Sequence, residues 1–215
     1  MTTSIEQFTD EYVLAEIKKI KYTYGLNSVI RYNLEREEHH KTQSVAEHVT
    51  NMLFLAYYFK ELEDPKLEMD FDKVVRMILV HDMAEIETGD IITTIKTSAD
   101  NEVERLAVKT VKEKSPEFVA KEIEELYDEI EETKTFEARY VKAIDKLEGQ
   151  IFWIEKEGVE MVDFIDKKTG IDINVVYPIM MDKINKMLND FDFKYIIRFM
   201  EVIHQERMKT GLINY

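Results

Sequence analysis

The feature that most restricts the fold of this chain is its shortage of turn-forming residues. Only 6 glycines and 3 prolines occur among 215 residues. A protein built from many short strands needs frequent turns, and glycine and proline are prominent among the residues that supply them. Hydrophobic residues make up 45% of the sequence, enough for a sizeable core. We therefore expect an all-α protein. No repeat or linker-like stretch interrupts it, which predicts one helical domain over residues 1–215.

Apolar residues recur at helical spacing along most of the chain. The clearest segment follows Ser44 and carries Val45 and Met52 on one face, and Ser44 with Glu47 forms a capping-box pattern at its start. Asp70 is placed to cap the next helix. Residues 87–99 are predicted to be a loop. The other expected helices cover residues 4–22, about 100–114, 116 onward after a Ser115 cap, 133 or 135 to 157, about 174–189 and 192–209.

Charge and missing residue types exclude several classes of protein. The net charge of −15 disfavours non-specific binding to nucleic acid or to an anionic membrane. The absence of cysteine excludes disulfides and thiolate metal sites. The polar start "MTTSIEQFTDEY" has no apolar signal segment, and no apolar run reaches about 18 residues. We expect a soluble cytoplasmic protein that binds neither nucleic acid nor membrane.

Three of the predicted helices carry ionisable side chains on apolar faces. His48 lies on the apolar stripe after Ser44, His81 and Asp82 follow the apolar run "MILV", and Asp145 lies four residues after Val141. A buried unpaired carboxylate costs several kcal/mol, and two close together cost more. A divalent cation is one partner that satisfies all four groups. Two imidazoles and two carboxylates without thiolates suit Mn²⁺, Fe²⁺, Co²⁺, Ni²⁺ or Zn²⁺.

Each of these residues taken alone has a simpler explanation. A single inward histidine is more often a hydrogen-bonded core residue than a metal ligand, and a His-Asp pair often arises by chance. Glu47 is expected to act as the capping partner of Ser44. His39 and His40 lie in a polar run and are expected to be exposed, and His204 is expected to pack or to face solvent. The metal prediction therefore rests on the four inward residues jointly.

Four short segments resemble the HD-domain metal-dependent phosphohydrolases. They are "RYN" at 31–33, "SVAEH" at 44–48, "LVHDMAEIETGDI" at 79–91 and "AIDKLEG" at 143–149. The order His, His-Asp, Asp is similar to that of the superfamily. The arginine–aromatic pair before the first histidine, and the Glu and Gly-Asp after His-Asp, resemble its bacterial 5′-deoxynucleotidase branch. The similarity covers about residues 26–155, and the expected helices over about 174–209 look generically helical. The resemblance implies a single HD-type multi-helix bundle.

The resemblance also implies a metal centre and a reaction. His48, His81, Asp82 and Asp145 would bind one divalent ion, which is Mn²⁺, Co²⁺, Fe²⁺, Ni²⁺, Zn²⁺ or Mg²⁺. Glu85 would be the catalytic carboxylate near the attacking water, with Asp82 as both ligand and catalytic residue. The implied activity removes the 5′-phosphate from (deoxy)nucleoside monophosphates through a metal-activated water. A bound metal supplies this chemistry by lowering the pKa of water and polarising a phosphoryl oxygen.

Four further residues are implied to contact the nucleotide. Arg31 would hold the phosphate, because the guanidinium fork matches phosphate geometry. Tyr32 stands where the family typically has tryptophan, so its role in stacking or sugar discrimination departs from the family pattern. Asp90 would contact the sugar or shape the pocket. Lys96 is a further candidate phosphate contact.

Three alternatives remain beside this interpretation. Alarmone hydrolases of the same superfamily carry a second acid directly after the glutamate, where this chain has Ile86. Cyclic-dinucleotide diesterases use further histidines for a second metal, and the spare histidines here lie in no matching motif. The chain could also be a non-catalytic helical protein that binds a metal or a nucleotide. Arg31 and Glu85 argue against that, since a structural metal needs neither. By analogy with the family, a homodimer is open.

Overall fold

The secondary-structure elements in the described part of the chain are all helices, as expected. The computed structural model describes residues 5, 9–36, 42–91, 96–152, 154, 170 and 173–209. In these ranges there is no strand, only one isolated bridge between Ile30 and Ser44. No helix there is both long and apolar enough to cross a membrane. The elements are α1 (Asp10–Thr23), η2 (Tyr24–Asn27), η3 (Arg31–Asn33), α2 (Val45–Glu63), α3 (Phe71–Val80), α4 (Glu85–Thr88), α5 (Ser98–Lys114), α6 (Glu117–Glu132), α7 (Phe136–Phe152), α9 (Ile173–Phe191) and α10 (Lys194–Lys209).

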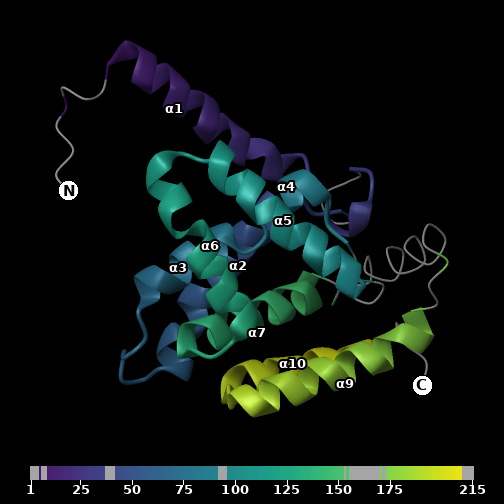
Figure 1. Cartoon of the computed structure of the whole chain (residues 1–215). Coiled ribbons are helices and arrows are strands. Elements are labelled where there is room, and N and C mark those ends of the chain that lie inside the picture. The colour runs from purple at the N-terminus through teal and green to yellow at the C-terminus, as the bar shows by residue number, and fades with distance from the viewer. Residues whose placement is uncertain are drawn as a thin grey trace.

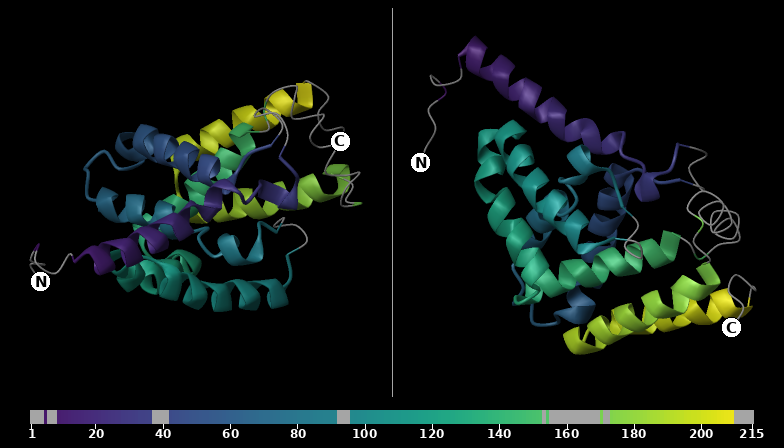
Figure 2. Two further views of the ribbon diagram at one scale, coloured as in Figure 1. Left: turned by 90° about the horizontal axis from the view of Figure 1, so that it is seen from above. Right: turned by 45° about the vertical axis from the view of Figure 1, so that its right-hand side comes forward.

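Helix α7 lies at the centre of the bundle. It contacts α2, α3, α6, α9 and α10 (Figure 1). Its residues Tyr140, Ile144 and Leu147 are fully buried, and each side chain of this size contributes about 1.5–3 kcal/mol when it leaves water. The paired helices α9 and α10 lie along one side of α7, whereas α1 extends away from the opposite side (Figure 2). A charged residue on the inward face of α7, such as Glu148, is therefore buried.

Local sequence signals set most helix starts. Ser44 and Glu47 form the expected capping box at the start of α2, and the Asp70 carboxylate accepts from Lys73 N at the start of α3. Thr135 Oγ1 accepts from Ala138 N at the start of α7. The cap at Ser44 matters most for the site, because it fixes the first turn of α2, from which His48 projects.

Some predicted boundaries are wrong. The first helix begins at Asp10, after the cap Thr9, and not at residue 4. Ser115 does not cap α6: its hydroxyl is buried and makes no hydrogen bond in the described structure, and Pro116 is the N-cap rather than the first helical residue. The loop predicted over 87–99 is shorter, because α4 reaches Thr88 and a Thr97 capping box starts α5 at residue 98. Residues 92–95 and the predicted end of α7 at 157 lie outside the described residues.

Candidate metal centre and substrate cavity

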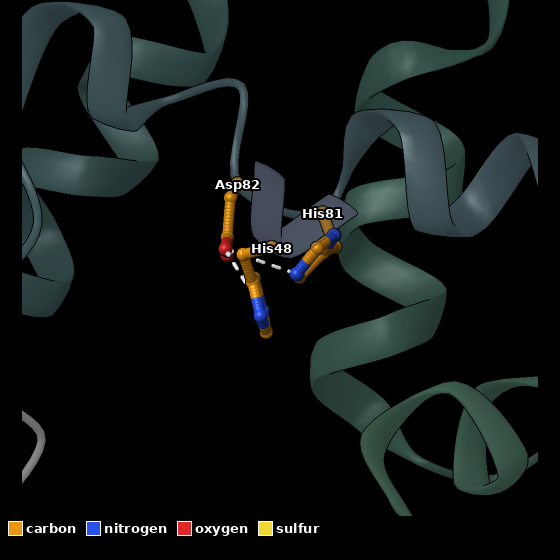
Figure 3. Close-up of side chains that lie close together, drawn as sticks. All are labelled: His48, His81 and Asp82. Carbon is orange, nitrogen blue, oxygen red and sulfur yellow. Dashed lines mark ion pairs between the residues drawn. The ribbon is translucent and has the colours of Figure 1, made fainter. Parts of the chain in front are cut away.

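Two helices and one turn bring the predicted ligands together. His48 projects from α2 and Asp145 from α7. His81 and Asp82 lie in the turn between α3, which ends at Val80, and α4, rather than on a continuing helix as expected. One ligand atom from each of His48, His81 and Asp82 lies within 4.8 Å of the others (Figure 3). Residues far apart in sequence thus meet at one point.

Both histidines are held so that their Nε2 atoms face this point. His81 Nδ1 is 2.7 Å from the carbonyl oxygen of Ile78, so it carries the proton and donates. His48 Nδ1 is 2.5 Å from Glu148 Oε2 and 2.9 Å from Arg31 Nη1. We assign the Nδ1 proton to the shorter contact, because a carboxylate only accepts. Neither Nε2 makes a hydrogen bond within the described structure. This is the arrangement in which neutral histidine binds a metal through Nε2.

Two carboxylates complete the cluster. Asp82 Oδ2 lies 3.0 Å from His81 Nε2 and 3.7 Å from His48 Nε2, and Asp145 Oδ1 lies 3.3 Å from His48 Nε2. Burial opposes ionisation of Asp82, but the adjacent His81 outweighs it and lowers the pKa of Asp82 below its usual range. Burial likewise opposes ionisation of Asp145, but Lys146 and His48 hold the pKa of Asp145 well below its usual value. Two ionised carboxylates and two Nε2 atoms form a donor set that suits a borderline divalent cation.

Glu148 is a further residue of the candidate site, and no motif in the sequence singles it out. Its side chain is 3% exposed and contacts His48. Oε1 accepts from Gln43 Nε2 at 2.7 Å and from Asn51 Nδ2 at 3.0 Å, and Oε2 accepts from Arg31 Nη1 at 3.1 Å. Burial alone would raise its pKa, but His48 and then Arg31 lower it. The signal was present: Glu148 follows Asp145 by three residues, on the same face of α7.

Arg31 and Tyr32 form a tight turn next to this cluster. Arg31 Nε lies 3.5 Å from Asp90 Oδ2, so its guanidinium lies between Asp90 and Glu148. Tyr32 has a left-handed backbone with φ 64°, a conformation uncommon outside glycine. Its backbone N–H donates to Asp90 Oδ2 at 2.8 Å. Burial raises the pKa of Asp90 despite Arg31. In the structure Asp90 therefore holds the Arg31–Tyr32 turn.

Glu85, the predicted catalytic carboxylate, is the first residue of α4 and faces the cavity. Its Oε2 is buried and makes no hydrogen bond in the part of the chain described. Burial, followed by the charges of Asp82 and Asp90, raises the pKa of Glu85 well above its usual value. A carboxyl group whose pKa is raised keeps its proton more readily than a free one and can exchange it with a reacting group.

A cavity of about 600 Å³ opens above the cluster, within the range of small-molecule sites. Among the predicted site residues, Arg31, His81, Asp82, Glu85, Asp90, Lys96 and Asp145 line it. Tyr32 is not in the described lining; its ring packs 5.1 Å from Arg31 Cζ. Lys96 Nζ is 2.5 Å from Glu104 Oε2.

Helix α9, which looked generically helical in the sequence, supplies Lys183, Lys186, Met187, Asp190 and Phe191 to the wall.

His204, the one further histidine among the described residues, does not join this cluster. His204 on α10 stacks on Tyr177 with ring centroids 6.1 Å apart, so the expectation that it packs is confirmed. His39 and His40 lie outside the described residues. The group of residues in the described structure that could hold a metal ion is that of His48, His81 and Asp82, with Asp145 beside it.

Comparison with known proteins identifies a family and several similar proteins. The HD domain family matches residues 25–188. A human protein named 5′-deoxynucleotidase is 34% identical over 137 residues, which cover 60% of this chain and 65% of that protein. The Dictyostelium discoideum protein of the same name is 36% identical, over 60% of this chain and 72% of that one. The 5′-deoxynucleotidase of Saccharomyces cerevisiae is 30% identical, over 71% and 69%. The chain matches just under two thirds of the length of its human, bovine and mouse relatives.

A solved structure shows the same fold. It is that of a predicted metal-dependent phosphohydrolase from Magnetospirillum magnetotacticum, with a TM-score of 0.73 at 21% identity, covering 94% of this chain and 96% of that one. At this level of identity the likeness shows the fold, and function has to be argued from the site.

Proposed function

The chain belongs to the HD-domain family, and from its site we propose that it is a metal-dependent phosphohydrolase that removes the 5′-phosphate from nucleoside monophosphates. The observation that carries the proposal is the convergence of two Nε2 atoms, both lacking hydrogen-bond partners in the described structure, with two carboxylates at the base of a cavity of about 600 Å³. The names of the relatives support the nucleotide part of the proposal, including a preference for deoxyribose.

In this proposal His48, His81, Asp82 and Asp145 hold one divalent cation. When bound, such a cation lowers the pKa of water and polarises a phosphoryl oxygen. The protein's own contribution is to orient the donors. Glu148 fixes the ring of His48 through Nδ1, and the Ile78 carbonyl does the same for His81. Partners of this kind also raise the basicity of the ligating histidine.

Glu85 is proposed to exchange a proton with the attacking water or the leaving oxygen. It lines the cavity beside Asp82 and Asp145, and its pKa is raised by burial and the neighbouring acids. Arg31 is proposed to orient the phosphate from the cavity wall. Because Arg31 also contacts Glu148 and Asp90, part of its charge is already offset. The remaining charge of the phosphate then has to be met by the cation.

The alarmone alternative loses support from the packing of Ile86. This residue replaces the second acid of those hydrolases, and it lies against η2: a Cβ added at Gly25 would be 2.9 Å from Ile86 Cγ2. Ile86 therefore has a packing role, and the carboxylate of an acid at this position would lie against the backbone of η2. We therefore favour the monophosphatase over the alarmone hydrolase.

A phosphatase screen with added Mn²⁺ or Co²⁺ tests the proposal. Deoxyribonucleoside and ribonucleoside 5′-monophosphates are compared with nucleoside 3′-monophosphates and p-nitrophenyl phosphate. We expect metal-dependent release of phosphate from the 5′-monophosphates, fastest from the deoxy forms. A protein that binds the metal but hydrolyses none of these esters would support the non-catalytic alternative instead.

A further inference from the structure

Most cations in the cavity wall already have a carboxylate partner. Lys96 pairs with Glu104 at 2.5 Å. Lys142 Nζ lies 2.6 Å from Glu131 Oε1, and Lys146 Nζ lies 2.8 Å from Asp145 Oδ2. Arg31 contacts Glu148 and Asp90, as described above. These four cations are therefore largely committed to holding the site together, and they leave little uncompensated charge for an anionic ligand.

Lys183 and Lys186 on α9 differ from these four. They are three residues apart, so they lie on the same face of the helix, and both line the cavity. Both are exposed, and no described carboxylate lies within ion-pair distance of either one. Among the described residues that line the cavity, they are the two cations without a carboxylate partner. Their exposure places them at the outer side of the cavity, whereas the lining residue His81 of the metal cluster has a side chain that is only 7% exposed.

We propose that Lys183 and Lys186 form a second anion subsite that accepts a phosphate of the substrate other than the one being cleaved. The proposal rests on the proposed function and extends it to nucleotides with two separate phosphates, such as nucleoside 3′,5′-bisphosphates. Asp190 follows Lys186 by one turn and also lines the cavity. It repels an anion, so the second phosphate lies toward Lys183.

The reaction on such a substrate is an ordinary hydrolysis. The oxygen of water forms a bond to the 5′-phosphorus, and the bond from that phosphorus to O5′ breaks. O5′ takes up a proton, and inorganic phosphate leaves. The 3′-phosphate stays on the product, so the subsite acts on recognition and not on chemistry. The effect is therefore expected in KM and Kd, with kcat little changed.

The test compares 2′-deoxyadenosine 5′-monophosphate with 2′-deoxyadenosine 3′,5′-bisphosphate. The protein with Mn²⁺ should show a KM about tenfold lower for the bisphosphate, the factor expected from about 1.4 kcal/mol of added binding. Lys183→Gln/Lys186→Gln should abolish this advantage and leave hydrolysis of the monophosphate unchanged. Lys18→Gln/Lys21→Gln on α1 is the matched control, because it changes the net charge equally outside the cavity lining. That control should retain the advantage.

Binding separates failure of the subsite from failure of the proposed function. Calorimetric titration of both nucleotides is carried out in the Glu85→Gln background, in which hydrolysis is suppressed. If neither nucleotide is hydrolysed by the unaltered protein, the proposed function fails, and the Kd ratio still decides the subsite. Equal Kd values for the two nucleotides would overturn the subsite. So would a double lysine variant that weakens both nucleotides by the same factor, since the lysines would then serve the scissile phosphate.

Discussion

The base and the outer wall of the cavity are built in opposite ways. At the base, His81, Asp82 and Asp145 line the cavity, and they lie next to His48 and Glu148, which are buried outside its described lining. The polar groups here are held by neighbours: Glu148 alone is contacted by four side chains. The outer wall, formed by Lys183 and Lys186 on α9, is exposed and has no ion pair among the described residues. A base that is held this firmly fixes the geometry of the chemistry. Exposed side chains on the outer wall can change conformation to contact a ligand, and they can therefore set which ligand binds.

The largest effect should come from Glu85 at the base. We expect Glu85→Gln to lower kcat by about 10²–10⁴-fold, the usual contribution of a general acid or base. KM should change little and bound metal should be retained, because Glu85 is not proposed as a ligand. Steady-state kinetics with elemental analysis measures both. Near-normal kcat at saturating metal and substrate would assign the proton transfer to another group.

The next largest effect contrasts Glu148 at the base with Glu131, which pairs with Lys142 at the cavity wall. Glu148→Ala leaves buried His48 without its carboxylate acceptor and Arg31 with Asp90 as its one described carboxylate partner, and it should cost about 3–5 kcal/mol of unfolding free energy. Glu131→Ala removes an ion pair whose carboxylate is 55% exposed and should cost about 0–1 kcal/mol. Urea unfolding measures both values. Equal losses would mean that the base is no more tightly constrained than the wall.

Metal removal should act on the base alone. If the cation binds only the folded protein, a metal concentration 100 times Kd adds about 2.7 kcal/mol of stability. Chelation should therefore lower Tm, and by the same amount in Lys183→Gln/Lys186→Gln as in the unaltered protein. Thermal melts with and without chelator provide the measurement. An unchanged Tm after confirmed metal loss would argue against a metal that offsets the clustered acids.

The smallest effect concerns Glu47. This residue precedes His48 in the sequence, but its side chain is partly exposed whereas His48 is buried. The Arg36 guanidinium lowers the pKa of Glu47 from an ordinary 4.5 to about 2, helped by Ser44. A lowered folded-state pKa stabilises the protein above pH 4.5, and the contribution disappears as the pH falls toward 2. Because the side chain is 40% exposed, the benefit relative to Glu47→Gln should be about 1 kcal/mol or less. Unfolding measured from pH 7 to pH 3 should show the difference shrinking, and a constant difference would mean that the charge of Glu47 contributes nothing.

The base of the cavity could be anticipated from sequence because its residues violate a strong rule. Ionisable side chains rarely lie on apolar helix faces, so His48, Asp82 and Asp145 were conspicuous. The same rule applied to Glu148, but its neighbours Lys146 and Asp145 made it look like one more charged residue. Its place three residues after Asp145 was the one signal, and the packing of α7 against α2 shows that Glu148 turns inward.

The outer wall could not be anticipated, because it violates no rule. Lys183 and Lys186 lie among polar residues on an amphipathic helix, where lysine is ordinary. Their significance depends on which helix lies opposite, and α9 reaches the cavity only through tertiary packing. The backbone of Tyr32 was hidden for a similar reason. Its left-handed conformation is held by Asp90, 58 residues away in sequence, and no local pattern signals it.

Metal binding by Asp145→Asn tests the central claim most directly, because Asp145 is the one proposed ligand that comes from α7. Calorimetric titration with Mn²⁺ should give one site per chain in the unaltered protein. Loss of partners that only orient a ligand typically costs about 10–100-fold in metal affinity, so loss of Asp145 itself should cost more, while circular dichroism remains helical. Asp190→Asn, an acid of the outer wall, should bind Mn²⁺ normally. Unchanged stoichiometry and affinity in Asp145→Asn would contradict the metal centre proposed here.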